Sequence, residues 1–417
     1  MTDVSASILT TADGKPLKAA LAASQARARR KAFMLVAPLF LFVVITFVIP
    51  IGQMLFQSVY NDTFSATAPA LRQWFDENPP GTEPDEAAYA ALVSDLRLMR
   101  EERSAGAAGT RINYDISGTR SMFTGMARKA DKLEPPYKEA VLAEDKKWDN
   151  PDVWRAMRSA SSPFTIDFYL AALDMTRDET GSIVGVKEGQ AVYKMLFGRT
   201  LFLSALITVM CMALAFPIAH MLATLPMAKS NLLMILVLLP FWTSLLVRTT
   251  SWMVLLQSQG VVNDFLVWAG IVGDDGRIQM MYNQIGTVVA MTHILLPFMV
   301  LPLYSVMRTI PPSYVRAARS LGATSWTAFR RIYLPQTLPG IGAGALLVFI
   351  LAVGYYITPA LVGGADGQLI SNLIAFHMQK SLNWSLAAAL AALLLGGILI
   401  LYWLYDRLVG IDNMKLG

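Results

Sequence analysis

Long apolar runs alternate with polar stretches along the 417 residues of the chain. A membrane-spanning helix needs about 20 consecutive and mostly apolar residues. Six runs reach that length, at about residues 33–57, 196–224, 231–256, 285–307, 338–362 and 384–408. The pattern therefore predicts an all-α membrane protein with six transmembrane helices.

Composition and charge agree with a place in the membrane. Hydrophobic residues make up 54% of the chain and charged residues only 16%, which is too apolar for an ordinary soluble protein. The net charge of +5 does not indicate nucleic-acid binding, because the basic residues cluster beside the apolar runs and orient a membrane protein there. The single cysteine, Cys211, excludes an intrachain disulfide and a cysteine metal cluster.

The charges beside the apolar runs predict the orientation of the chain. Residues 1–32 form a polar tail that we expect in the cytoplasm, since it ends in four basic residues, Arg27, Arg29, Arg30 and Lys31. The run 33–57 is longer than the roughly 7 to 15 apolar residues of a cleaved signal, so we interpret it as a retained span. The sequence Ala-Thr-Ala at 66–68 leaves signal cleavage as an alternative. Six spans return the tail 410–417 to the cytoplasm.

Residues 58–163 are polar and fall outside the cytoplasm if the tail lies inside it. Helical patterns appear there at about residues 85–103, 121–133, 136–147 and 151–159. The segment has no His and no Cys, and its acids are scattered, so it shows no catalytic arrangement. We expect a helical periplasmic insertion between the first two spans, with a docking role or a spacer role as alternatives.

The polar stretch 311–335 lies between two apolar runs and is strongly basic. Its arginines, with no acid among them, are Arg316, Arg319, Arg330 and Arg331, preceded by Arg308. The positive-inside rule therefore predicts a cytoplasmic loop. Prolines at 311 and 312 favour a helix over about 313–321, and Gly322 suits the left-handed residue that ends one. Thr324 or Ser325 then caps a second turn, in which three aromatic residues share a face: Trp326, Phe329 and Tyr333.

This loop resembles the ATPase-coupling loop of the membrane-spanning permeases of bacterial binding-protein-dependent ABC importers. The pattern in that family is Glu-Ala-Ala, three residues, Gly, nine residues, and Ile-x-Leu-Pro. The chain matches it in register at Ala317, Ala318, Gly322, Ile332, Leu334 and Pro335. Arg316 departs from it, because the family usually has Glu there. The resemblance implies the type I ABC importer permease fold, with this loop in contact with a separate ATPase.

The reversed charge at Arg316 changes what the partner must offer. If the usual Glu makes a polar contact to the ATPase, the resemblance implies either a compensating acid there or a second permease that carries the usual Glu. An Arg-rich helix that lies on anionic lipid is the alternative interpretation of the loop.

Other stretches extend the resemblance over the predicted permease core, residues 164–409. They are LPFWTSLLVRT at 239–249, LPFMVLP at 296–302, TPALVGG at 358–364 and NW at 383–384, and they look like the branch associated with spermidine and putrescine import. The resemblance implies a bacterial inner-membrane complex with a second permease, identical or homologous, an ATPase dimer and a periplasmic solute-binding protein. It places ATP and Mg²⁺ on the ATPase, and this chain has no phosphate-binding loop, since its only Gly-Lys pair precedes Pro16.

Three residues in the apolar runs are candidates for the translocation pathway: Arg248, Trp242 and His293. An arginine at mid-bilayer costs roughly 2.5 to 3.5 kcal/mol on insertion scales, so Arg248 should not face lipid. It lines the pathway, pairs with a carboxylate from outside its span, or reaches to the outer interface. A cation in the pathway counts against a polyamine cargo. His293 is able to line a cavity, although hydrogen-bonded packing is the commoner role of such a residue.

These observations predict a non-catalytic permease subunit that forms half of a pathway for a small solute, with spermidine or putrescine as the first candidate. Two other classes stay open: a membrane receptor or assembly protein that acts through residues 58–163, and a secondary transporter. The secondary transporter is disfavoured, because the chain lacks clear inverted repeats and intramembrane acids that would bind a coupling ion.

Overall fold

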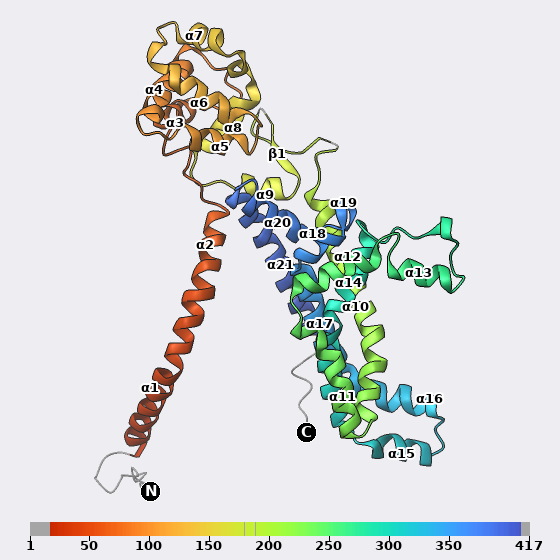
Figure 1. Ribbon diagram of the computed structural model, residues 1–417. Coiled ribbons are helices and arrows are strands. Elements are labelled where there is room, and N and C mark those ends of the chain that lie inside the picture. The colour runs from red at the N-terminus through yellow and green to blue at the C-terminus, as the bar shows by residue number, and fades with distance from the viewer. Residues whose placement is uncertain (1–16, 179, 188, 410–417) are drawn as a thin grey trace, which may run out of the picture. The chain divides into compact units, whose positions relative to one another are not determined.

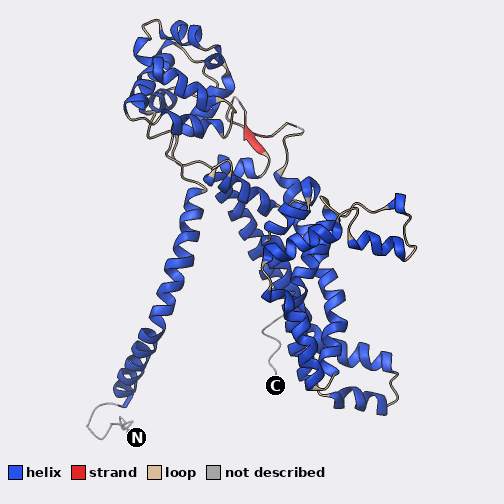
Figure 2. Ribbon diagram, viewed as in Figure 1, coloured by secondary structure: helices blue, strands red, loops and turns tan. Residues whose placement is uncertain are grey.

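The computed structural model describes residues 17–178, 180–187 and 189–409 (Figure 1). Helices dominate, as the sequence predicts, and the described part of the chain contains one two-stranded sheet (Figure 2). The chain divides into two compact units, Met1–Gln57 and Ser58–Gly417. The predicted tail 410–417 and the first half of the predicted tail 1–32 lie outside the described residues.

The first unit is one long helix. It consists of α1 (Leu17–Val43), the π-helical turn η1 (Val44–Val48) and α2 (Ile49–Gln57). Pro50 accounts for the wide turn, because a proline ring clashes with the carbonyl four residues before it in a regular helix. The stretch Ser24–Gln57 is long and apolar enough to cross a membrane. The helix begins well before residue 33, since basic and alanine residues continue it toward the N-terminus.

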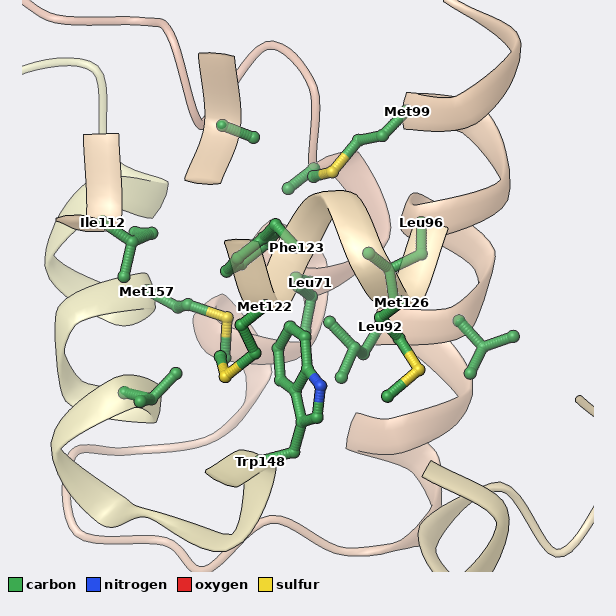
Figure 3. Close-up of a cluster of buried hydrophobic side chains, with 14 of the residues drawn as sticks. Leu71, Leu92, Leu96, Met99, Ile112, Met122, Phe123, Met126, Trp148 and Met157 are labelled. Atoms are coloured by element: carbon green, nitrogen blue, oxygen red, sulfur yellow. The ribbon is translucent and has the colours of Figure 1, made fainter. Parts of the chain in front are cut away.

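The helical module, residues 58–163, has a hydrophobic core of its own. Its elements are α3 (Pro69–Glu77), α4 (Glu86–Glu101), α5 (Ala105–Asn113), α6 (Thr119–Lys129), η2 (Ala130–Lys132), α7 (Tyr137–Glu144), η3 (Lys146–Asp149) and α8 (Pro151–Ser161). Figure 3 shows the indole of Trp148 among the buried side chains of this core, which include Leu71 and Met122. Each of the four predicted helical patterns contains a helix. The sequence missed α3 and α5.

The helix α5 is short and rich in Ala and Gly, which gives it little helical signal in the sequence. Its Gly109 lies against α6, where an added Cβ atom would be 2.9 Å from Arg120 Cα and 2.9 Å from Phe123 Cβ. The glycine that weakens the isolated helix is therefore required for its close contact with α6.

The module joins the rest of the second unit through a paired linker. The Asn61 N–H donates to the Pro163 carbonyl at 2.8 Å, and the Thr165 N–H donates to the Val59 carbonyl at 2.9 Å. The chain therefore enters and leaves the module side by side.

Side chains of α5 also hold the module against the apolar helices. The Arg111 guanidinium lies 4.9 Å from the centre of the Phe168 ring in the short helix α9 (Asp167–Ala172). The Tyr114 hydroxyl, just after α5, donates to the Leu382 carbonyl at 2.8 Å. These contacts fix the module at two points besides its linker.

The remaining long helices of the second unit are α10 (Tyr193–Thr224), α14 (Gln284–Thr309), α17 (Leu334–Gly354) and α21 (Trp384–Val409). The first three pack on one another around buried apolar residues such as Ile207, Ile294 and Val348. Gly344 of α17 permits this packing, since an added Cβ atom would lie 2.6 Å from Met299 Sδ of α14. Four of the predicted spans thus correspond to single helices of the second unit, although the one predicted at 338–362 has other bounds.

The span predicted at 231–256 is not one helix. The chain forms α11 (Met227–Leu238), η4 (Leu239–Trp242) and α12 (Leu245–Leu256), followed by α13 (Val261–Trp268) and η5 (Asp274–Gly276). Pro240 cannot continue the hydrogen-bond ladder of α11, and the Ser244 hydroxyl starts α12 by accepting from the Val247 N–H. The axis bends by 97° at this break. The described residues thus hold five helices able to cross a membrane, or six if the bent pair is one span.

The span predicted at 338–362 also needs correction. The helix begins earlier, runs continuously over Ser325–Gly354 and ends at Gly354, where Tyr355 adopts an extended conformation. Three short helices follow: α18 (Ile357–Val362), α19 (Gly364–Gly367) and α20 (Ile370–Gln379). A hairpin of β1 (Met175–Arg177) and β2 (Ile183–Gly185), with Asp178 accepting from backbone N–H groups in its turn, is the exception to the all-α prediction.

The buried carboxylate of Asp95 predicts a pH dependence of the helical module. Asp95 of α4 accepts from the Ala70 and Leu71 N–H groups at 3.0 and 2.7 Å and so caps α3. Burial raises the pKa of this carboxyl from 3.8 to about 6, although both hydrogen bonds oppose the shift. The folded module therefore holds a proton between about pH 4 and 6 that the unfolded module releases. This contribution to the free energy of unfolding is present below pH 4 and is lost as the pH rises to 6, by about 3 kcal/mol.

Hydrogen exchange of the α3 and α4 amides in the full chain measures this effect. We expect the difference in protection between the wild type and Asp95→Asn to change across the pH 4 to 7 window. Replacing the exposed Asp76 by Asn is the matched control. Parallel pH profiles for the wild type and Asp95→Asn would contradict the burial argument.

Candidate functional site

The loop 311–335 folds into a helical hairpin. Its first arm is α15 (Pro312–Ser320), and its second is α16 (Ser325–Ala328), which continues through the π-helical turn η6 (Phe329–Tyr333) into α17. Figure 1 shows this hairpin beyond one end of the group formed by α10, α14 and α17. The helix predicted at 313–321 is therefore confirmed to within a residue.

Gly322 ends α15 in the conformation that the sequence predicts. Its φ of +90° is left-handed, and its N–H donates to the Arg319 carbonyl at 3.0 Å. The Ala323 N–H donates to the Ala318 carbonyl at 3.1 Å. These two bonds make a Schellman motif, which satisfies carbonyls at the end of the helix and turns the chain sharply. A side chain at Gly322 would meet nothing within 4 Å, so only the backbone conformation requires glycine here.

The second arm is anchored on α10. Thr324 caps α16 by accepting from the Thr327 N–H at 3.2 Å. The rings of Trp326, Phe329 and Tyr333 then stack in sequence, with centroids 5.7 and 5.9 Å apart, as their predicted shared face requires. The Tyr333 hydroxyl shares a hydrogen bond of 3.0 Å with His220 Nδ1 of α10. The hairpin is therefore joined to three long helices, covalently to α14 and α17 and through Tyr333 to α10.

The first arm presents charge and apolar surface that nothing in the described chain covers. The helix α15 has no buried residue, and Leu321 just after it is 90% exposed. The exposed arginines of the hairpin, none of them in an ion pair with another described residue, are Arg316, Arg319, Arg330 and Arg331. Such a surface suits an acidic partner with an apolar recess.

The structure places the predicted loop residues in two groups. The exposed arm α15 carries Arg316, Ala317 and Ala318, and Gly322 ends it. The anchored arm carries Ile332 and Leu334, both half-buried. Pro335 lies in the first turn of α17, where its missing N–H leaves no helical bond unmade. The sequence reasoning did not find the bond between Tyr333 and His220, since no spacing in the sequence connects these two residues.

Two of the three predicted pathway residues come together in a second cluster. The Trp252 indole of α12 donates to His293 Nδ1 of α14 at 3.0 Å. Arg248, one helical turn before Trp252, acts electrostatically on His293 and on Tyr355. Trp242 is 74% exposed on η4 and has no hydrogen bond or ring contact with either residue within the described part of the chain.

The hydrogen-bonding capacity of the Arg248 guanidinium is not fully used. Its Nε atom is buried and has no hydrogen-bond partner among the described residues. A neighbouring bond of 3.2 Å between the Thr249 and Thr358 hydroxyls fixes α12 to α18 and so holds the backbone on which Arg248 stands. The sequence signalled this cluster through the charge of Arg248 and through His293, while Trp252 and Tyr355 were missed. The described residues contain no group of three or more His, Cys, Asp or Glu that could hold a metal ion.

The anchoring of the hairpin can be tested at Tyr333. Tyr333→Phe removes one hydrogen bond, whose net contribution is about 0.5 to 1.5 kcal/mol, and should raise local opening of η6 roughly twofold to tenfold. The side chains of Arg330 and Arg331 are already exposed, but trypsin cleaves after them only when the helical backbone of η6 opens, so the rate of cleavage there should rise by that factor. Tyr314→Phe, at an exposed position of α15, is the matched control and should leave the rate unchanged. Equal cleavage of Tyr333→Phe and the wild type would show that the bond to His220 does not hold the hairpin.

Comparisons of the sequence with known proteins identify a family of membrane transport proteins. Residues 180–410 match the family described as "Binding-protein-dependent transport system inner membrane component". Over 249 residues the chain is 34% identical to the spermidine/putrescine transport system permease protein PotB of Salmonella typhimurium (strain SL1344), covering 59% of this chain and 80% of that protein. PotB of Escherichia coli (strain K12) is also 34% identical over 249 residues, with 84% of its length covered.

A solved bacterial ABC transporter for the acidic polysaccharide alginate aligns with 54% of this chain and 80% of its own, at 20% identity and a TM-score of 0.45. The match to the family model spans more than half of the chain. The chain therefore belongs to the family of inner-membrane components of binding-protein-dependent transport systems, the permeases of ABC importers.

Proposed function

We propose that this importer permease forms half of a translocation pathway and receives its energy through the hairpin 311–335 from a separate ATPase dimer. The observation that carries the proposal is α15, a short basic helix that has no fully buried residue yet is connected to three long helices, α10, α14 and α17. The connection consists of the Schellman turn at Gly322, the stacked rings and the bond between Tyr333 and His220. A push on α15 would therefore tilt α10 and α17 together.

The charge of the hairpin specifies the ATPase surface. Arg316 and Arg319 carry the exposed face of α15 and have no acid beside them among the described residues. The complementary ATPase surface offers carboxylates at the position that, in other family members, contacts the Glu of the permease loop. ATP and Mg²⁺ belong to that partner in this proposal, and the permease binds no cofactor of its own.

The orientation follows from the same charges. The basic hairpin and the basic helix α1 belong in the cytoplasm, which places both termini there and the helical module in the periplasm. The module contributes no large exposed apolar side chain between residues 58 and 163, which supports a position in water. We assign it to docking the periplasmic binding protein, because it is fixed to the apolar helices at the face where cargo arrives.

The relatives give the first candidate for the cargo. Both PotB proteins are named for spermidine and putrescine transport, and they match this chain over most of their length. A polyamine is therefore the proposed cargo. Selectivity in this class of importer is shared with the binding protein, so the cargo assignment and the permease assignment are tested separately.

Uptake of radiolabelled spermidine by proteoliposomes that contain the complete complex and the binding protein tests the function. We expect ATP-dependent uptake in the wild type and none with a hydrolysis-deficient ATPase. Gly322→Val forces a side chain into a left-handed conformation at a cost of about 1 to 2 kcal/mol, so uptake and retention of the ATPase should fall roughly tenfold. Gly276→Val, at an exposed glycine with open space around it, is the control. Full uptake in Gly322→Val would contradict coupling through the hairpin.

Deletion of the module tests its docking role. The paired linker between Asn61 and Pro163 lets residues 66–158 be replaced by a short Gly-Ser linker without separating the chain ends. We expect the complex to assemble at normal yield, while uptake at limiting binding protein falls several-fold and recovers at a high concentration of it. Unchanged uptake at every binding-protein concentration would leave the module a spacer only.

A further inference from the structure

The cluster around Arg248 contains a positive charge without a counter-charge. The apolar helices α1, α10, α11, α12, α14 and α17 contain no Asp and no Glu. The acid of α21, Asp406, stands in its last turns, far along the helix from Trp384. Asp264 of α13 is occupied by Arg277 at 2.7 Å. Asp366 of α19 is exposed and forms no ion pair with Arg248 in the described part of the chain.

The position of the cluster makes this imbalance significant. His293 is the tenth residue of α14, so it lies about 14 Å along the helix axis from the start at Gln284. The bond between Trp252 and His293 sets α12 against this level of α14, and Arg248 stands one helical turn, about 6 Å, before Trp252 in α12. Charged groups at such depth face a partner charge or water and do not face lipid.

The described neighbours of Arg248 do not supply an acceptor for its buried Nε atom. Trp252 uses its N–H on His293 Nδ1, which leaves the other ring nitrogen of His293 as the donor of a neutral imidazole. The half-buried Arg248 offers five N–H groups, and its buried Nε finds no acceptor among the described residues. The Arg248 guanidinium, a fixed cation with an unpaired N–H donor, is best satisfied by an acceptor that carries negative charge.

The face of α12 beside Arg248 is open. Leu246 and Val247 are 59% and 55% exposed, and the hydroxyls of Thr250 and Ser251 are bonded to the carbonyls of their own helix. An apolar face with internally satisfied hydroxyls packs against another helix without leaving a polar group unpaired. The charge of Arg248 and the open face of α12 together suit a contact with another helix that includes one ion pair.

We propose that Arg248 pairs with a carboxylate carried by a membrane helix of a second permease that is not identical to this chain. The inference rests on the proposed function, in which a second permease completes the pathway. Two identical chains would bring a second Arg248 and no intramembrane acid, so they would repel where this surface needs attraction. The cargo does not supply the carboxylate, since the proposed polyamine is itself a cation. Neutralised in this way, Arg248 no longer opposes a cationic cargo.

Cross-linking from the open face identifies the partner without disturbing the charge. The complex carries the photoreactive p-benzoylphenylalanine in place of Val247, with Arg248 intact, and the product is sequenced by mass spectrometry. A cross-link to a helix of a different permease that contains Asp or Glu is the expected result. Cross-links to a second copy of this chain, or to lipid alone, would overturn the proposal.

A double-mutant cycle then tests the ion pair itself. We expect Arg248→Gln to lower the yield of the intact complex about tenfold, Arg248→Lys to lower it less, and neutralisation of the cross-linked acid in the Arg248→Gln background to restore it. Arg199→Gln, which changes a half-buried arginine bonded to the Ala365 carbonyl, is the control. Normal yield of Arg248→Gln, with uptake lost only for anionic solutes, would assign Arg248 to cargo and refute the ion pair.

The two proposals fail in different ways. If the wild-type complex contains no ATPase or shows no ATP-dependent uptake, the proposed function fails. If the wild type transports normally and Arg248→Gln assembles and transports normally too, only the inference about Arg248 fails.

Discussion

The hydrogen bond between Tyr333 and His220, together with the ring stack of Trp326, Phe329 and Tyr333, holds the basic hairpin against α10, and the rest of the proposed coupling depends on it. The helix α15 has no fully buried residue, and among its side chains Val315 packs partly buried against the core. Since α14 leads directly into the hairpin, η6 continues into α17 and Tyr333 reaches α10, a displacement of the hairpin acts on three long helices. Close packing of these helices on α14, made possible at Gly344, keeps them from moving independently.

Sequence reasoning predicted those elements whose cause is local. The apolar runs predict the single long helices, because each crossing of a bilayer requires its own uninterrupted set of backbone hydrogen bonds. Gly322 and Thr324 predict the turn and the cap of the hairpin, because both act within four residues. The break in the third span is also local in origin, but Pro240 alone does not reveal it. Many membrane helices tolerate a proline in their interior, as α10 does at Pro217, so the 97° bend has to be seen.

What the sequence could not predict are contacts between residues far apart in the chain. Gly109 looks unfavourable for a helix until α6 is placed against it. His220 of α10 bonds to Tyr333 of the basic hairpin, 113 residues further along the chain. Likewise, the apolar pattern gave no reason to join Arg248 to His293, since they stand on different helices and only the fold brings them together.

The distribution of charge along the chain connects these parts. Arginines at the hairpin are exposed and have no partner acid among the described residues, while four acids of the helical module form ion pairs with bases of the same module, as Asp152 does with Arg155 at 2.6 Å. A surface that neutralises itself is suited to water and to brief contacts, whereas an arm of uncompensated arginines is stable only when a complementary partner is close. Arg248 follows the second pattern inside the membrane, where the cost of an unpaired charge is higher than at a surface. In the proposed assembly, the ATPase supplies acids to the hairpin and a second permease supplies one to Arg248.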